Sequence, residues 1–435
     1  MTAVYKAFKR HFYNSRNIPN MVNLIVTPET GLADEHVHIK ASGLQPNQLA
    51  TIRLTLHDEK ENVFQSRAFY KADVEGQINL DSNPALGGNY QGVHPMGLLW
   101  SLKPLKPFQR PVKKDVKAGP FLYTVDLFEF LSVGLGGAEP QPTCSATFNR
   151  WHIAADVQRT QIRDGRLRGT IFSPAGTGPY PGIIDLFGGG GGLAEYRASL
   201  LASRGFVVFA LAYFGYEDLP RSFQKLDLEY FEEATDLLLK HPKVAGPKLG
   251  VLGVSKGAEI GLLLASYLPQ IGATVSINGS CNIYGSTIYH RGKVLIKGAP
   301  YIAEKTVITK EGFMSTAGLY EPRADSLIPV ERASGHILFL ASAADQYYNS
   351  QQFAQFPFYR LMRNEKTKSR MIIYPGAGHL IEPPGFPFSY ASHLRGQNLP
   401  LLYGGEMIPH CQAEDSIWKE IQVFFRKHLL PSSNL

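Results

Sequence analysis

The first third of the chain alternates hydrophobic and polar positions, and this pattern predicts β-strands. The alternation runs from about residue 23 to residue 148 and is clear at Ile52, Leu54 and Leu56. Because successive side chains of a strand point to opposite faces, such runs are typical of sheets with one buried face. We therefore expect an all-β sandwich domain over residues 21–150.

The remainder of the chain changes to short apolar runs that alternate with helical patterns. The clearest helix signal is Leu226–Leu239, where apolar residues form one stripe and glutamates lie opposite. This alternation predicts a mainly parallel sheet with flanking helices over residues 151–435, with the boundary near residues 145–160. The expected strands are Leu167–Phe172, Gly182–Leu186, Phe206–Leu211, Leu249–Val254, Ala273–Ile277, Ile337–Ala341 and Met371–Tyr374. Residues 283–329 are irregular, and an insertion of this kind can form part of a substrate cover.

Composition places the chain among ordinary globular proteins, since 44% of its 435 residues are hydrophobic and 19% are charged. The longest apolar run, Phe206–Phe214, is far shorter than the roughly 18 residues that cross a bilayer, so we expect no integral membrane segment. Cys144, Cys281 and Cys411 are widely spaced and odd in number, which fits a reducing compartment better than a zinc or disulfide framework. The expectation is a soluble, intracellular protein.

The net charge of +7 is compatible with nucleic acid, anionic lipid or a phosphorylated small molecule. The densest basic segment, Lys103–Lys117, contains three prolines and lacks the helical spacing of an element that reads a DNA groove. We expect no nucleic-acid partner. A solvated loop is favoured for this segment, and a phosphate contact is the alternative.

Both termini carry weak targeting signals. Residues 1–20 contain four basic residues and no acid, so they predict a basic peripheral extension, with a mitochondrial presequence as the alternative. Ser433-Asn434-Leu435 is a degenerate form of the Ser-Lys-Leu peroxisomal signal. We expect a cytoplasmic or peroxisomal protein, and the sequence sets no oligomeric state.

The candidate nucleophile is Ser255, within Gly253-Val254-Ser255-Lys256-Gly257. The bare motif is weak, because a chain with 42 glycines matches it by chance at a substantial rate. Its context is stronger, since the apolar run Leu249–Val254 leads into the serine and an apolar helix leaves it. A strand, a sharp turn and a helix form the nucleophile elbow of the α/β-hydrolase fold, and we expect this fold after the sandwich. An incidental serine at a Gly-rich strand end is the alternative.

Two backbone N–H groups are expected to hold the oxyanion. One belongs to Lys256 at the start of the helix, where the helix dipole is positive. The other comes from Gly188 or Gly189, which open a run of five glycines after an expected strand. A phosphate-binding loop is the alternative for this run, but the Gly-Lys-Ser/Thr ending of a P-loop is missing.

The acid and the base should follow later strands, in the order Ser, Asp, His. Asp345 follows the strand that ends near Ala341, and His379 lies in a glycine-rich loop after Tyr374. His379 would take the serine proton as general base, and Asp345 would orient the imidazole. Three later histidines are interpreted as structural; they are His393, His410 and His428, the last in a helix expected over Trp418–Leu429. This chemistry requires no metal and no other cofactor.

Long segments of the chain resemble the acyl-CoA thioesterases that share a fold with bile acid-CoA:amino acid N-acyltransferase. These segments are Leu86-Gly87-Gly88, Gly92–Leu102, Glu195–Ala202, Tyr216–Pro220, Leu228–Ala234, Ile277–Ser280 and Tyr374–Pro384. The resemblance covers almost the whole chain. It implies a fatty acyl-CoA or bile acyl-CoA substrate and places the catalytic residues at Ser255, Asp345 and His379.

The nucleophile divides this family, because the thioesterases have serine where the similar amino acid transferase has cysteine. An acyl-serine ester is less reactive toward an amine than a thioester, so Ser255 favours hydrolysis by water. The Pro375–His379 segment and the Ser-x-Leu terminus look more like the transferase branch, and conjugation of glycine or taurine is the alternative. A catalytically silent acyl-CoA binding protein is a third hypothesis, of a different class.

Overall fold

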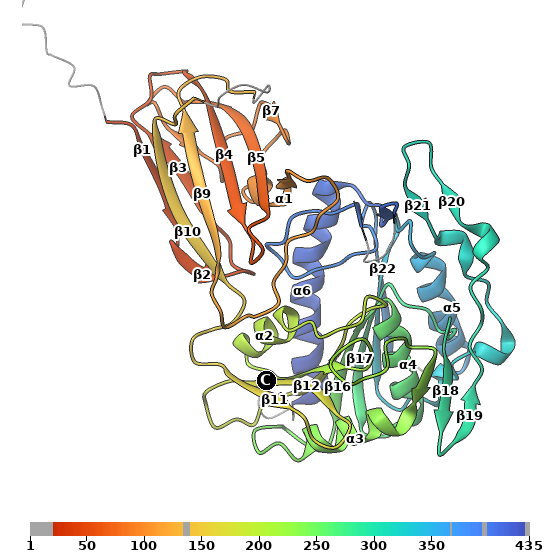
Figure 1. The fold of residues 1–435 in the computed structure, drawn as a ribbon. Coiled ribbons are helices and arrows are strands. Elements are labelled where there is room, and N and C mark those ends of the chain that lie inside the picture. The colour runs from red at the N-terminus through yellow and green to blue at the C-terminus, as the bar shows by residue number, and fades with distance from the viewer. Residues whose placement is uncertain (1–20, 134–139, 366–367, 394–397, 431–435) are drawn as a thin grey trace, which may run out of the picture.

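A computed structural model gives the structure, and it describes residues 21–133, 140–365, 368–393 and 398–430 (Figure 1). The basic extension expected over residues 1–20 and the C-terminal Ser433-Asn434-Leu435 lie outside these ranges. No helix within the described ranges has the length and hydropathy needed to cross a membrane.

The N-terminal part is a β-sandwich, as expected, with two sheets that share one apolar core (Figure 1). The larger sheet contains, in order, β2 (Thr30–Leu32), β10 (Cys144–Trp151), β9 (Phe121–Phe128), β4 (Leu49–His57), β5 (Val63–Lys71) and β7 (Gly87–Gly88), with β8 (Lys103–Pro104) also paired to β5. The smaller sheet contains β1 (Asn23–Thr27), β3 (His38–Ser42) and β6 (Ile78–Asn79), and a short helix α1 (Gly97–Trp100) lies nearby. Ile39, Ile52, Leu54 and Leu56 are fully buried in the shared core.

The C-terminal part is built on a sheet of eight strands. Their order is β11 (Gln158–Ile162), β12 (Arg168–Ser173), β14 (Val207–Ala212), β13 (Gly182–Leu186), β16 (Leu249–Val254), β17 (Ile271–Ile277), β22 (His336–Ser342) and β23 (Ser369–Tyr374). The first two join the sheet antiparallel, and every pairing from β14 to β23 is parallel. The expected mainly parallel sheet is confirmed.

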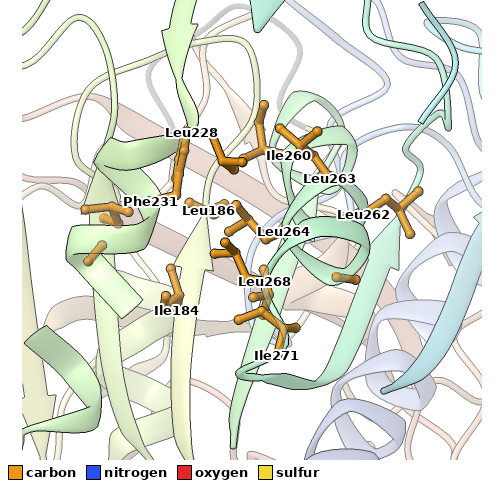
Figure 2. Close-up of a cluster of buried hydrophobic side chains, with 14 of the residues drawn as sticks. Ile184, Leu186, Leu228, Phe231, Ile260, Leu262, Leu263, Leu264, Leu268 and Ile271 are labelled. Carbon is orange, nitrogen blue, oxygen red and sulfur yellow. The ribbon is translucent and has the colours of Figure 1, made fainter. Parts of the chain in front are cut away.

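Five helices cover the two faces of this sheet (Figure 1). Their bounds are α2 (Tyr196–Ser203), α3 (Leu228–Leu239), α4 (Lys256–Tyr267), α5 (Ser350–Arg363) and α6 (Met407–Leu429). Helices α3, α4 and α5 pack on one face, where Leu186 meets Phe231 and Ile260 in one cluster (Figure 2). Helices α2 and α6 pack on the other face, around Leu252 and Val275. These layers confirm the α/β-hydrolase fold.

Short strands and turns complete the C-terminal domain outside the eight-stranded sheet. They are β15 (Lys225–Asp227), β18 (Thr287–His290), β19 (Lys293–Ile296), β20 (Val307–Ile308), β21 (Met314–Ser315), β24 (Ala391–Ser392) and β25 (Leu401–Leu402). Four 3₁₀ turns accompany them, at Ala303–Lys305, Ala317–Leu319, Ala324–Ser326 and Val330–Arg332. The irregular character expected for residues 283–329 agrees with these short pieces.

Two helix starts differ from the sequence expectation. Helix α3 begins at Leu228 instead of Leu226, because Lys225–Asp227 pair with β18. Helix α6 begins at Met407, eleven residues before the expected Trp418. Pro409 lies in its first turn, where proline is tolerated because the N–H it lacks would have no acceptor within the helix.

A buried carboxylate of the sandwich domain binds the catalytic domain. The Asp34 side chain is 2% exposed and lies 2.6 Å from the Arg204 guanidinium, which follows α2. The indole N–H of Trp418, from α6, donates to the same carboxylate at 2.8 Å. The Asp34 carboxylate is shielded from solvent and binds residues at the end of α2 and within α6. This contact therefore helps to fix how the two domains meet.

Helix α6 packs closely on β16, and this packing predicts a large loss of stability for Phe425→Ala. Phe425 is fully buried, and a Cβ at Gly250 would collide with its ring. Removing the ring leaves a cavity that rigid strands cannot fill, so the free energy of unfolding should fall by about 3–5 kcal/mol. Urea unfolding measures this change.

The matched control is Val423→Ala in the same helix, because Val423 is 59% exposed. The control should change the free energy of unfolding by about 0.5 kcal/mol or less. Equal losses in the two variants would contradict the packing of α6 described above.

Candidate active site

The backbone turns sharply at Ser255, between the end of β16 and the start of α4. Ser255 has φ 54° and ψ −119°, a region that side-chain-bearing residues rarely adopt. A Cβ at Gly253 would collide with the backbone of Gly257, and one at Gly257 would collide with the carbonyl oxygen of Leu186 on β13. Strand and helix therefore approach closely only because both positions are glycine.

Ser255, His379 and Asp345 form a continuous hydrogen-bonded chain. His379 Nε2 lies 3.0 Å from Ser255 Oγ, and His379 Nδ1 lies 2.7 Å from Asp345 Oδ2. Because an ionised carboxylate only accepts hydrogen bonds, Nδ1 carries the proton and Nε2 accepts from the serine hydroxyl. Ser255 is 7% exposed, and the side chains of His379 and Asp345 are 3% and 1% exposed. The structure thus brings together the three residues singled out in the sequence.

Asp345 is held by three further donors, two from the segment that leads into α5 and one from its first residue. The backbone N–H groups of Tyr347 and Tyr348 donate to Oδ1 at 2.7 and 2.9 Å, and the Ser350 hydroxyl donates to Oδ2. These bonds leave Oδ2 directed at His379. A carboxylate with this many donors orients the imidazole without freedom to rotate.

The loop that carries His379 is fixed by Asn278, which follows β17. The Asn278 amide donates to the His379 carbonyl at 2.8 Å, and its oxygen accepts from the Ser342 N–H at 2.8 Å. The His379 N–H donates to the carbonyl of Tyr403 at 2.9 Å. Asn278 is buried and has φ 48°, so it is a strained connector between the ends of β17 and β22.

The two expected sources of oxyanion donors lie beside the nucleophile. Lys256 is the first residue of α4, so its N–H has no acceptor within the helix. A Cβ placed at Gly188 would lie 3.3 Å from the Ser255 Cβ, which puts this glycine against the serine. Gly188 and Gly189 line a cavity of about 110 Å³ together with Ser255 and His379. The glycine loop therefore borders the cavity beside Ser255, and the Lys256 N–H directly follows this serine at the start of α4.

The cavity also contains a charged group from the sandwich domain. Arg110 lines it and pairs with Glu382, which accepts a further hydrogen bond from Tyr196 at 2.8 Å. In the same basic segment, Lys113 is 1% exposed and lies 2.5 Å from Glu59. The expectation of a solvated loop is therefore wrong at Lys113, whose side chain is buried against Glu59, whereas the Arg110 side chain is 29% exposed.

The three remaining histidines have structural surroundings. His410 accepts the Gly378 N–H at 2.9 Å and lies 3.3 Å from Glu414, so it supports the loop before His379. His428 stacks on His336 at 3.7 Å, and burial lowers the pKa of His428 to about 4. The ring of His393 packs edge-on against Phe108. Each agrees with the structural interpretation.

Sequence patterns missed several residues that hold this site. Asn278, Tyr348 and Glu259 contact the three central residues or their loops. A polar residue directly after a buried strand was an available signal for Asn278. Glu259 gave none, because a glutamate in the first turn of a helix ordinarily faces solvent. Within the described residues, His, Cys, Asp and Glu form no group of three or more that could hold a metal ion.

Two family models and several relatives match the chain. Residues 34–164 match the model described as Acyl-CoA thioester hydrolase/BAAT N-terminal region, and residues 226–431 match BAAT / Acyl-CoA thioester hydrolase C terminal. Acyl-coenzyme A amino acid N-acyltransferase 1 of Mus musculus is 47% identical over 416 residues, which are 95% of this chain and 99% of that protein. Bile acid-CoA:amino acid N-acyltransferase of Homo sapiens is 45% identical, over 94% and 99%. Acyl-coenzyme A thioesterase 1 of Homo sapiens is 44% identical, over 91% and 94%.

The close approach at the Ser255 turn predicts that Gly257→Ala damages the site. The added methyl group would collide with Leu186 O, so α4 must shift away from β13. A shift of about 1 Å in a reacting group can cost about 10²-fold in rate. Labelling of Ser255 by a fluorophosphonate probe measures the loss.

Gly261→Ala is the matched control in the same helix. A Cβ at Gly261 would lie 3.2 Å from Val251 and 3.7 Å from Thr274, contacts that a small adjustment relieves. Labelling in this variant should remain close to that of the parent protein. Equal labelling of both variants would argue against the close approach at Gly257.

Proposed function

Because the chain belongs to the family of acyl-CoA thioester hydrolases and bile acid-CoA:amino acid N-acyltransferases, we propose that it hydrolyses acyl-CoA through an acyl-Ser255 intermediate. The observation that carries this proposal is the hydrogen-bonded chain from Ser255 through His379 to Asp345. The serine stands on a sharp turn, and its hydroxyl donates a hydrogen bond to the unprotonated nitrogen of the imidazole. This arrangement suits attack on a thioester carbonyl.

In the first step, Ser255 Oγ attacks the carbonyl carbon while its proton passes to His379 Nε2. The negative charge forms on the former carbonyl oxygen, and the N–H groups of Lys256 and of Gly188 or Gly189 are the proposed donors to it. Asp345 stabilises the imidazolium. The C–S bond then breaks, and His379 returns the proton to the departing CoA thiolate.

In the second step, water attacks the acyl-serine ester and gives its proton to His379. The bond between the acyl carbon and Ser255 Oγ then breaks, His379 returns the proton to Oγ, and the acid is released. The reaction moves one acyl group and protons, so it needs neither a metal nor a redox cofactor. Burial supports this path, because Ser255 and His379 are shielded from bulk solvent where hydrogen bonds to a developing charge are strong.

Transfer to an amino acid is the second candidate function. It is favoured by two relatives named amino acid N-acyltransferases, which are 47% and 45% identical to this chain, against 44% for a thioesterase. Both outcomes share the acyl-enzyme and differ only in the group that attacks it. A silent acyl-CoA binding protein is the third hypothesis, and it predicts no turnover.

The compartment stays a prediction. The degenerate signal Ser433-Asn434-Leu435 favours a peroxisomal or cytoplasmic protein, and the basic residues 1–20 offer a mitochondrial alternative.

Ser255→Ala should abolish release of CoA from palmitoyl-CoA. Loss of the nucleophile is expected to lower kcat by about 10³-fold or more. A thiol reagent measures the released CoA.

The matched control is Ser266→Ala, because Ser266 lies in α4 and is also 7% exposed. Equal CoA release by Ser255→Ala and the parent protein would contradict the acyl-serine proposal. Absence of CoA release from both would favour the silent binding protein.

Ser255→Cys separates the two candidate outcomes. A thioester intermediate reacts more readily with amines than an ester does, so the ratio of N-acyl product to free acid should rise by about tenfold. Mass spectrometry after reaction with palmitoyl-CoA and glycine or taurine gives this ratio. If the parent protein already forms mainly N-acyl amino acid, transfer replaces hydrolysis as its activity.

A further inference from the structure

A lysine and a glutamate are buried together directly behind the nucleophile. The side chains of Lys256 and Glu259 are 3% and 0% exposed, and Lys256 Nζ lies 2.7 Å from Glu259 Oε2. Both belong to the first turn of α4, which begins immediately after Ser255. Burying two charges is unfavourable unless each is paired and fully hydrogen-bonded. A buried pair at this position therefore suggests a role other than stabilising the fold.

The pair binds the irregular region that follows β17. Lys256 Nζ donates to the carbonyl of Tyr284 at 2.8 Å, and the N–H of Tyr284 donates to Glu259 Oε2 at 3.2 Å. Tyr284 is fully buried in an aromatic cluster with Tyr320 and Phe353. One residue of the irregular region 283–329 is therefore held at both its N–H and its C=O by the side chains at the start of α4.

The pair also reaches the other two residues of the hydrogen-bonded chain. The hydroxyl of Tyr348 donates to Glu259 Oε1 at 3.2 Å. The N–H of the same tyrosine donates to Asp345 at 2.9 Å, and its ring lies edge-on to His379 with centroids 5.2 Å apart. Tyr348 thus connects Glu259 to the acid and to the base.

We propose that Glu259, paired with Lys256, is a positioning residue that holds the Lys256 N–H and the His379 ring in register with Ser255. This inference rests on the proposed function, because it concerns the same acyl-enzyme chemistry. Neither side chain touches the reacting atoms. Each acts through a backbone group or through Tyr348.

The chemistry of the pair suits this role. Every oxygen of Glu259 has a donor, and Lys256 Nζ has two acceptors and lies 5.3 Å from the centre of the Phe223 ring, so both buried charges have partners. Burial raises the pKa of Glu259 and lowers that of Lys256, and the opposite charge of each partner offsets these shifts. Directed bonds of this kind fix the start of α4 in one place, whereas apolar packing would permit it to slide.

The test begins with Glu259→Gln in the full chain, assayed with palmitoyl-CoA. The substitution leaves Lys256 buried without a counter-charge, so the start of α4 should move. We expect kcat to fall by about tenfold or more, with KM changed by less than about threefold, because positioning acts on the reaction step.

The double variant Lys256→Gln/Glu259→Gln supplies the rescue. Two amides can hydrogen-bond to each other without an unpaired charge, so this variant should recover kcat to within about threefold of the parent protein. Tyr348→Phe removes the third bond without touching the charges, and it should lower kcat by about threefold. If Glu259→Gln fails to fold, the Tyr348→Phe variant still tests the proposal.

The matched control is Glu59→Gln in the sandwich domain. It also removes the partner of a buried lysine, Lys113, and the other donors to Glu59 are the backbone N–H groups of Lys114 and Asp115, outside the hydrogen-bonded chain. This variant should lower Tm while kcat of the folded protein stays unchanged. An unchanged kcat in Glu259→Gln, or an equal fall in Glu59→Gln, would overturn the positioning role. Absence of CoA release from the parent protein would instead overturn the proposed function.

Discussion

The site depends on one backbone constraint, the left-handed turn that Ser255 adopts between β16 and α4. Gly253 and Gly257 allow this turn, since a side chain on either would collide with neighbouring backbone. The strained residue stands on the central strands of the sheet, where parallel pairing on both sides prevents relaxation. As a result the serine hydroxyl leaves the sheet toward the cavity, and the N–H of Lys256 at the helix start has no partner in α4.

Parallel strands explain why distant residues meet at that turn. Ser255 follows β16, and Asp345 and His379 come soon after β22 and β23, which lie on the same side of the sheet order. Because parallel strands end at one edge, residues that follow them gather there. The order of these three residues could therefore be predicted from the sequence, since each prediction needed only a strand and the loop after it.

Contacts that depend on side chains from separate elements could not be predicted in this way. Asn278 reaches the carbonyl of His379, and Tyr348 reaches Glu259, over separations of 101 and 89 residues. Local patterns were also misleading where long-range partners decide burial. Lys113 belongs to a segment rich in proline and charge, yet its side chain is 1% exposed and pairs with Glu59, 54 residues away. In the same way, the helical pattern does not reveal the first turns of α6, because Pro409 and the preceding Gly404 and Gly405 are typical of loops.

The group that finally accepts the acyl chain depends more on the reactivity of the acyl-enzyme than on the volume of the cavity. A cavity of about 110 Å³ admits water or a small amino acid, so its volume does not choose between them. The proposed intermediate does distinguish them, because an acyl-Ser255 would be an oxygen ester, which is a poorer acyl donor to amines than a thioester. His379 can activate water from the same position in which it accepted the serine proton, since its Nε2 already faces the reacting group. An amine would need a site of its own beside the ester, whereas water needs only the base, and this difference favours hydrolysis.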